Sequence, residues 1–251
     1  MFYKEHKQEW KIMKLQFEAF DKETELLFDP PRPAIQALPE WYKNMPTRMD
    51  NEKTDGLSKD GVAVSNLTLK GCSPFLDALS IGYVFELPFD LEFRFDQNRG
   101  INVRWATNIN FVGSHGPDQA PGLPVPFDGE SGILKWRPGW RVITPKGYSC
   151  LFTHPLNRND LPFRTFSGVV DTDMYKLGVE FPFQLLTSIK QDIFILEKGT
   201  PICQVLPFKR DDWDSSVNEF NEEENKKQGF ILKSKLVRSY KQQFWQKKVY
   251  R

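Results

Sequence analysis

The chain has 251 residues and a mass of 29.3 kDa, which is long enough to bury a substantial core within one large domain. Its 39% hydrophobic content, 27% charged content and net charge of +1 exclude a disordered chain and one that coats a polyanion. The 21 phenylalanines and 7 tryptophans favour half-buried strands or a large contact surface.

The N-terminal part predicts a strand followed by a proline-rich arm. Charges interrupt the first residues, so we expect neither a signal peptide nor a membrane span. Alternating apolar residues predict an opening strand within Trp10 to Phe20. Five prolines from residue 30 to 46 then predict an extended arm, with a short helix over Leu38 to Asn44. Polar residues 47–62 predict a surface loop, which completes an N-terminal unit over residues 1–62.

A β-rich core domain is predicted over residues 63–210. Ser73 is expected to cap a short helix that ends near Gly82. Three strands are expected after it: Tyr83 to Leu87, Leu91 to Phe95 and Ile101 to Thr107. Glycines and prolines from Asn108 to Glu130 predict a long loop, and the residues from Gly132 to Phe208 predict strands joined by turns.

The C-terminal residues 211–251 predict a helical, basic tail. Two helices are expected to meet near Gly229, because the segment has no proline and only this glycine. From Lys226 to Arg251 there are nine lysines or arginines and no acidic residue. Such a tail favours a solvated face on a docked helix, with contact to nucleic acid or to a neighbouring subunit as the alternative.

The cysteines, histidines and paired tryptophans of the core each have a structural and a functional interpretation. The three cysteines are widely spaced, which favours a reduced intracellular protein with Cys150 as a buried thiol. His115, His154 and Asp118 are the residue types of an Fe(II) site, although ordinary loop histidines are the favoured interpretation. Trp136 and Trp140 suit either base stacking or a place in the core.

Two polar motifs lie in the strand-rich stretch before residue 210. In LNRND and GVVDTD, Arg158 or Arg164 is expected to pair with Asp171 or Asp173 and to stabilise a loop crossing. The alternative is an anion or nucleotide pocket, because arginine forks suit phosphate. The expected structural polar junction consists of Asn157, Arg158, Asn159, Asp160 and Asp173.

The motifs PKGYSCLF, SGVVDTDMY and EKGTPICQVLPF, in this order, resemble the dUTPase and dCTP deaminase superfamily. The resemblance implies a mainly β (α+β) fold of the β-clip type, a distorted barrel of short strands, here with C-terminal helices. It implies nucleotide-binding roles for Asp171, Tyr175, Gln204, Arg158 and Arg164. In an enzyme of this family Asp171 would be the catalytic residue and Mg²⁺ the cofactor.

The chain departs from the superfamily pattern at three places. One residue is inserted between Asp173 and Tyr175, and no Arg-Ser-Gly-Leu phosphate loop is present. The helical tail stands where the superfamily has a glycine-rich motif that closes over the nucleotide. These departures favour a protein without catalytic activity and without a cofactor.

Most of the chain resembles a family of uncharacterised proteins encoded by large tailed bacteriophages, cyanophages among them. The segments that carry this resemblance include PPRPAIQALPEWYK, TPKGYSCLFTHPLNRNDLPFR and KGTPICQVLPFKRDDW. It implies a viral product in the host bacterial cytoplasm or in the virion.

The expected function is that of a non-catalytic β-clip-like phage protein, either a virion or assembly component or a binder of a host factor. The alternative is a nucleotide-binding or nucleotide-hydrolysing enzyme related to dUTPase and dCTP deaminase. Expected partners are further copies of the chain, in a trimer if the superfamily pattern holds, or other phage or host proteins.

Overall fold

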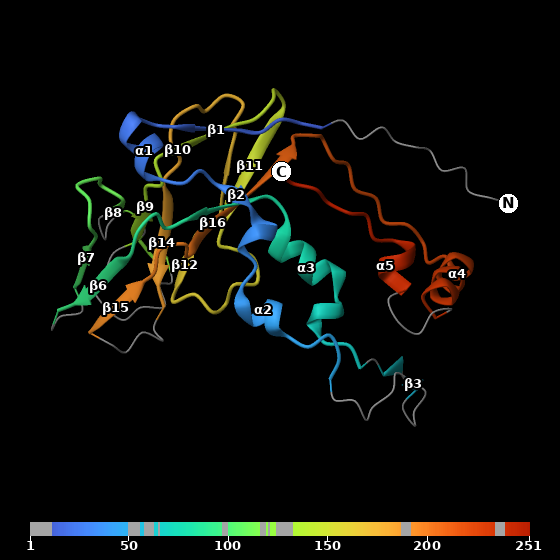
Figure 1. Cartoon of the computed structure of the whole chain (residues 1–251). Helices are drawn as coiled ribbons and strands as arrows, with labels where there is room; N and C mark the ends of the chain where they lie inside the picture. Colours follow the sequence, from blue (N-terminus) through green and yellow to red (C-terminus); the bar gives the residue numbers. More distant parts are fainter. Residues whose placement is uncertain are drawn as a thin grey trace.

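The computed structural model describes residues 12–49, 56–57, 63–64, 66–96, 100–115, 119, 121–123, 133–186, 192–233 and 239–251. These residues form antiparallel sheets that gather in one body, with short helices at its surface and two helices near the C-terminal end standing apart from it (Figure 1). The prediction of a mainly β fold with C-terminal helices is confirmed. No helix of the described chain is both long and apolar enough to cross a membrane.

The central sheet has five strands in the order β13-β11-β16-β5-β2. Their bounds are β13 (Gly168–Val170), β11 (Tyr148–Thr153), β16 (Pro201–Lys209), β5 (Tyr83–Glu86) and β2 (Arg32–Pro33). β11 pairs with β16 along its whole length, from Tyr148 opposite Lys209 to Thr153 opposite Gln204. Both strands are rich in apolar and β-branched residues, so both can be buried within a sheet.

Four smaller sheets accompany the central one. A four-stranded sheet has the order β12 (Phe163–Thr165), β14 (Phe181–Leu185), β9 (Leu134–Trp136) and β8 (Val112–Ser114). A three-stranded sheet has the order β15 (Ile193–Leu196), β6 (Leu91–Phe95) and β7 (Ile101–Arg104). The remaining pairs are β1 (Gln16–Ala19) with β10 (Trp140–Ile143), and β3 (Gly56–Leu57) with β4 (Ala63–Val64).

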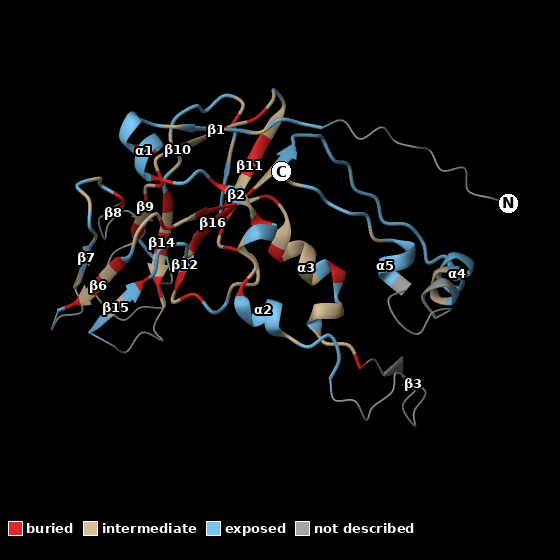
Figure 2. Ribbon diagram, viewed as in Figure 1, coloured by how far each residue is buried: buried red, intermediate tan, exposed pale blue. Residues whose placement is uncertain are grey.

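The core lies between these sheets and is dominated by aromatic side chains. Trp136 is completely buried and stacks on Phe183, with ring centroids 3.6 Å apart and planes 4° from parallel. Strand β14 places Phe181, Phe183 and Leu185 inward, because alternate residues of a strand point to the same face. Figure 2 shows buried residues concentrated on the strands of the body, whereas the described residues of α4 and α5 are mostly exposed.

The helices are short and lie mostly at the surface. They are α1 (Lys22–Leu27), α2 (Glu40–Asn44), α3 (Ser73–Ser80), α4 (Glu222–Lys233) and α5 (Ser239–Gln243), with 3-10 turns at Ala34–Ala37 and Leu69–Gly71. The helices expected within Leu38 to Asn44 and after Ser73 are confirmed, although Cys72 rather than Ser73 is the N-cap of α3. The two tail helices do not meet at Gly229. α4 runs through this glycine, whose cost of about 1 kcal/mol the surrounding helix formers tolerate.

Strands also form where only an arm and a loop were expected. β1 confirms the opening strand, and the proline-rich segment adds the outer strand β2 beside β5. Pro33 is tolerated there because an outer strand does not need every N–H for pairing. The loop predicted over Asn108 to Glu130 contains β8, which is held by pairing with β9. The division into residues 1–62, 63–210 and 211–251 stays a prediction.

The C-terminal end of the chain returns to the body. Trp245 Nε1 and Lys248 Nζ both donate to Asp77 Oδ2 on α3, at 2.9 and 2.6 Å. The Tyr250 ring packs edge-on against Tyr83, with centroids 5.8 Å apart. The end of the basic tail is therefore a docked segment, and residues 211–233 lie between β16 and this docked end along the chain.

Candidate functional site

An arginine from a distant part of the sequence binds the two aspartates of the GVVDTD motif. β13 ends at Val170, and residues 172–174 form a turn after it. Arg210 Nη1 donates to Asp171 Oδ1 at 3.2 Å and to Asp173 Oδ1 at 2.9 Å, and its Nη2 donates to Asp173 Oδ2 at 2.5 Å. We name this group of residues the Arg210 clasp: Ser149, Asp171, Asp173 and Arg210.

Further hydrogen bonds hold the Arg210 clasp together, among them one from Arg210 Nη1 to Ser149 Oγ at 2.9 Å. Ser149 Oγ donates to Asp171 Oδ1 at 2.6 Å, and the backbone N–H of Gly147 donates to Asp173 Oδ2 at 2.7 Å. The Asp173 side chain is only 3% exposed, and the hydrogen bonds from Arg210 and Gly147 lower its pKa to about 2. Asp173 is thus ionised and immobilised at neutral pH, which is unsuited to a general base, whose pKa should lie near the working pH.

The low pKa of Asp173 predicts how stability responds to acid. A carboxyl with a depressed folded-state pKa stabilises the fold above its ordinary pKa, here 3.8, and loses that contribution as the pH falls toward 2. We expect Asp173→Asn to lower the melting temperature at pH 7, and the difference from the unmodified chain to shrink between pH 4 and pH 2. Thermal unfolding followed by circular dichroism measures both.

Asp192→Asn is the matched control for this pH series, because Asp192 is exposed and its side chain forms no hydrogen bond or ion pair within the described chain. This variant should melt like the unmodified chain at pH 7. A difference between Asp173→Asn and the unmodified chain that stays constant from pH 7 to pH 2 would contradict the role of the Asp173 charge.

The two carboxylates of the Arg210 clasp do not fit Mg²⁺. The Arg210 guanidinium bridges them, so it occupies the position between the carboxylates that a shared cation would need. Within the described part of the chain, no group of three or more His, Cys, Asp or Glu side chains could hold a metal ion. We therefore derive no metal-assisted step for these residues.

LNRND and GVVDTD do not form the single junction that was expected. Arg158 pairs with Asp160 at 2.8 Å, and the aspartates of GVVDTD pair with Arg210 instead of Arg158 or Arg164. The reason is the length of β11, whose start lies beside the Arg210 clasp and whose end leads into LNRND. Six residues of strand span about 20 Å, too far for a side-chain pair.

The other LNRND residues support the loop itself. Asn157 has a φ of 60°, the left-handed conformation that asparagine adopts more readily than most residues, and Asn159 is exposed. Partial burial would raise the pKa of Asp160, but the hydrogen bonds and charge of Arg158 outweigh it and lower that pKa. Arg164 lies exposed on β12, opposite Gln184.

Gln204 is buried in the central sheet, and the protein backbone uses both ends of its amide. Gln204 lies on β16 and is only 1% exposed. Oε1 accepts from the N–H of Leu156 at 2.8 Å, and Nε2 donates to the carbonyls of Ala78 and Ile81 at 3.1 and 2.6 Å. Gln204 therefore joins β16 to the end of α3 and to the LNRND loop, and its amide is not directed at an external phosphate.

Tyr175 borders an open groove next to the Arg210 clasp. The turn at residues 172–174 places it there, because the Tyr175 N–H donates to the Asp171 carbonyl at 2.8 Å. The inserted residue therefore lies in a turn, where the alternation of strand faces does not apply. The groove has a volume of about 780 Å³, and Phe20, Leu177 and Arg137 also line it. Phe20 and Tyr175 are 51% and 44% exposed, so the groove offers aromatic contact surface.

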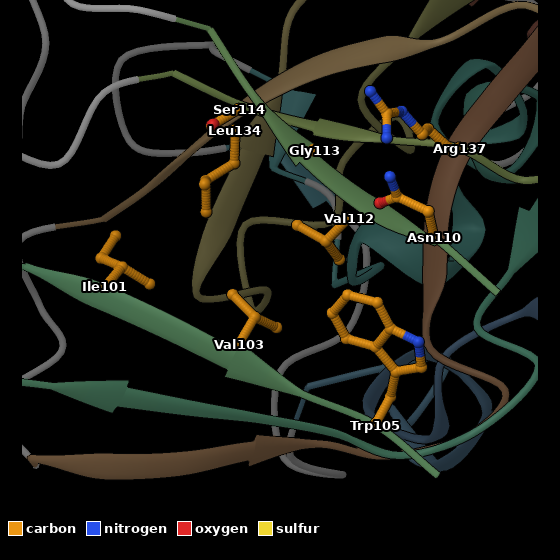
Figure 3. Close-up of a pocket in the computed structure, with 9 residues that line it drawn as sticks. All are labelled: Ile101, Val103, Trp105, Asn110, Val112, Gly113, Ser114, Leu134 and Arg137. Carbon is orange, nitrogen blue, oxygen red and sulfur yellow. The ribbon is translucent and has the colours of Figure 1, made fainter. Parts of the chain in front are cut away.

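A second groove of about 440 Å³ lies between β7 and β8 and shares Arg137 with the first (Figure 3). Figure 3 shows Ile101, Val103 and Trp105 along one side of it and Val112 opposite them. β7 and β8 are the outer strands of their sheets within the described chain. None of the nine lining residues is a carboxylate, a histidine or a cysteine, so this groove suits binding better than acid–base chemistry.

The remaining sequence candidates have structural roles. Cys150 is a buried thiol, as predicted, and burial raises its pKa to about 11. Trp136 and Trp140 belong to the core rather than to a base-stacking surface. His154 Nε2 lies 3.0 Å from the Arg158 carbonyl, so this ring joins the LNRND loop, and burial lowers its pKa. Asp118, the third residue of the iron hypothesis, lies outside the described residues.

Sequence reasoning missed Arg210 and Ser149, which complete the clasp. Both lie at strand ends, Ser149 in β11 and Arg210 directly after β16, and the pairing of these strands brings them together. The available signal was the register of β11 and β16. Because these strands are antiparallel and Tyr148 lies opposite Lys209, Arg210 follows opposite Gly147, and Ser149 lies two residues further along on the same face.

No family model matches the chain, and no curated protein matches its sequence at a significant level. Solved structures that resemble it include a mutant dUTPase from phage phi11 of S. aureus, described with a structural Mg(II) ion, at 11% identity and a TM-score of 0.31. The match covers 83% of this chain and 97% of that chain. The dUTPase of Staphylococcus bacteriophage 80alpha, described as controlling transfer of virulence genes, is 13% identical, with a TM-score of 0.33 and coverage of 83% and 99%.

These solved structures belong to the superfamily that the motif order resembles. Their identities and TM-scores are too low to transfer an activity, so function has to be argued from the residues of this chain.

Proposed function

We propose that this chain is a phage-encoded, non-catalytic β protein that acts by binding other phage or host proteins, in the virion, in its assembly or in the host cytoplasm. One observation carries the proposal: two of the side chains that the resemblance assigns to a nucleotide already bind groups of the fold. Asp171, the residue that the resemblance makes catalytic, accepts hydrogen bonds from Ser149 and Arg210, and the amide of Gln204 is used by the backbone. A general base has to be free to take a proton from a substrate or a water, and the hydrogen bonds to Asp171 compete with that role.

The exposed surface is suited to a binding role. The groove between β7 and β8 combines apolar side chains with the polar Asn110, Ser114 and Arg137, and two outer strands border it, which a partner can contact through side chains or by adding a strand. Exposed aromatic residues line the groove beside Tyr175. Apolar grooves rimmed by polar groups are typical of protein contact sites.

A second candidate is a nucleotide-binding relative of the dUTPases. It is favoured by one feature, the exposed ring of Tyr175 on a groove large enough for a nucleotide. Asp171 is also accessible, because its side chain is 62% exposed. Both side chains are accessible from solvent, although Asp171 also accepts from Ser149 and Arg210.

A thermal-shift experiment separates the two candidates. dUTP, dCTP and their monophosphates, each with Mg²⁺ and at millimolar concentration, should leave the melting temperature unchanged, because a ligand stabilises only a fold that binds it. Phosphate release from the triphosphates, measured in parallel, should stay at the rate of buffer alone.

Saturable stabilisation by a nucleotide would overturn the proposal, provided that Asp171→Asn abolishes it. Asp171→Asn is a suitable variant because it leaves the pair of Asp173 and Arg210 in place. Stabilisation that persists unchanged in Asp171→Asn and in Tyr175→Ala would place the nucleotide outside this site, and it would overturn both candidates in their present form.

A further inference from the structure

We propose that the acidic segment 211–224 of one copy of this chain docks in a lysine-lined groove of a second copy. This segment is here named the acidic arm. This proposal rests on the proposed function, because it presupposes that the chain acts by binding. It deepens that function by naming one partner, a second copy of the chain.

The acidic arm is exposed along its length, and its ion pairs within the described chain are confined to its two ends. Asp211 pairs with Lys209, and Glu222 and Glu224 pair with Lys226 and Lys227 on α4. The arm leaves the end of β16 and runs outward to α4 (Figure 1), and residues 211–221 are all exposed without secondary structure. Residues 212–220 form no hydrogen bond, ion pair or ring contact with the body within the described chain. Its three large apolar side chains are almost completely exposed: Trp213 at 91%, Val217 at 102% and Phe220 at 78%.

The composition of the arm defines the surface it fits. Residues 211–224 contain seven aspartates or glutamates and no lysine or arginine. An aromatic and aliphatic surface surrounded by carboxylates requires an apolar groove with a positive rim.

The chain carries a groove with these properties at the foot of the arm, here named the lysine groove. It has a volume of about 490 Å³, and Lys14, Lys247 and Lys248 line it while no carboxylate does. Its apolar lining includes Leu15, Pro207 and Val249. Lys248 also donates to Asp77, which lies on the neighbouring helix α3. The positive charge and the apolar lining complement the acidic arm.

The arm does not use this groove within its own copy. None of residues 211–224 lines the lysine groove, although the arm begins four residues after Pro207. Arm and groove are thus two complementary surfaces that both stay open in a single chain. When two copies meet, the arm of one fills the lysine groove of the other. This contact is head-to-tail, and repeated contacts of this kind can close into a ring.

The test uses two variants that act on opposite sides of the contact. The arm variant is Trp213→Ala, Val217→Ala and Phe220→Ala, and the groove variant is Lys14→Glu and Lys247→Glu. All five side chains are exposed, so both variants should keep the circular dichroism spectrum and melting temperature of a folded monomer. Light scattering coupled to size exclusion gives the mass of each species.

The unmodified chain should form an oligomer whose mass is a multiple of 29.3 kDa and which dissociates as salt is raised. Each variant alone should run as a monomer, with a dissociation constant raised by about 100-fold or more, because the removed groups are at the centre of the contact. An equimolar mixture of the two variants should form a dimer, since one intact arm can then enter one intact groove. Phe230→Ala removes an exposed ring on α4 and should leave the oligomer intact.

The proposal is overturned if the unmodified chain stays monomeric at all concentrations. An arm that docks in the groove of its own copy would give this result. The proposal is also overturned if either variant remains oligomeric, or if the mixture forms no dimer. Nucleotide hydrolysis would overturn the proposed function without affecting any of these masses, so the two failures are distinguishable.

Discussion

Gln204→Leu is expected to lower the free energy of unfolding by about 2 to 4 kcal/mol, since it leaves up to three backbone groups without their partner. Leucine has nearly the same size but cannot accept from Leu156 or donate to Ala78 and Ile81. For a chain of this length such a loss corresponds to a fall in melting temperature of roughly 5 to 15 °C. Urea unfolding followed by tryptophan fluorescence measures the free energy directly.

Gln184→Leu is the matched control, with the same substitution on a neighbouring sheet. Gln184 lies on β14, and its Oε1 is buried with no hydrogen-bond partner among the described residues. Removing an unpaired buried oxygen should leave stability unchanged or raise it slightly. Equal losses in the two variants would contradict the special role of Gln204, and a Gln204→Leu variant as stable as the unmodified chain would show that the fold does not need this amide.

The sequence was most informative where a single segment determines its own structure. β5, β6 and β7 follow from alternation and β-branched content, and α3 follows from a proline near its start and a glycine after its end. β8 was missed because its pairing with β9 decides its conformation, and the glycines around it indicate a loop. The sequence predicted a boundary between two helices at Gly229, where α4 in fact continues. The helix-forming residues around Gly229 outweigh the cost of the glycine, and the sequence pattern does not show this balance.

The site was less predictable because it depends on which strands are neighbours. The GVVDTD carboxylates are 37 and 39 residues from Arg210, and only the pairing of β11 with β16 brings these groups together. Arg158 and Arg164 are closer in sequence but lie beyond the far end of β11. For Gln204, the residue type was noted correctly, but its partners come from α3, more than a hundred residues earlier.

Gly82→Ala is expected to be among the most destabilising single substitutions in the chain. Gly82 has a φ of +71°, and a β-carbon at this position would lie 2.2 Å from the backbone oxygen of Val205 on β16. The left-handed conformation alone costs an alanine about 1 to 2 kcal/mol, and the clash with a strand adds about 1 to 3 kcal/mol. Urea unfolding should therefore show a loss of about 2 to 5 kcal/mol.

Gly199→Ala separates these two costs. Gly199 has a φ of +82°, and a β-carbon there would meet nothing within 4 Å, so this variant should lose only the cost of the conformation. A loss as large as that of Gly82→Ala would contradict the clash with Val205. The tight approach of Gly82 to Val205 also places Ile81 within reach of the neighbouring Gln204.

The double variant Gly82→Ala with Gln204→Leu tests this coupling. Gly82→Ala displaces the end of α3 and so already weakens the hydrogen bonds of Gln204. The free energy of unfolding lost in the double variant should therefore be smaller than the sum of the two single losses, by more than about 0.5 kcal/mol. Simple additivity would mean that the close contact and the amide stabilise the fold independently. The coupled result would show that one structural unit joins α3 to β16 and keeps Gln204 away from any ligand.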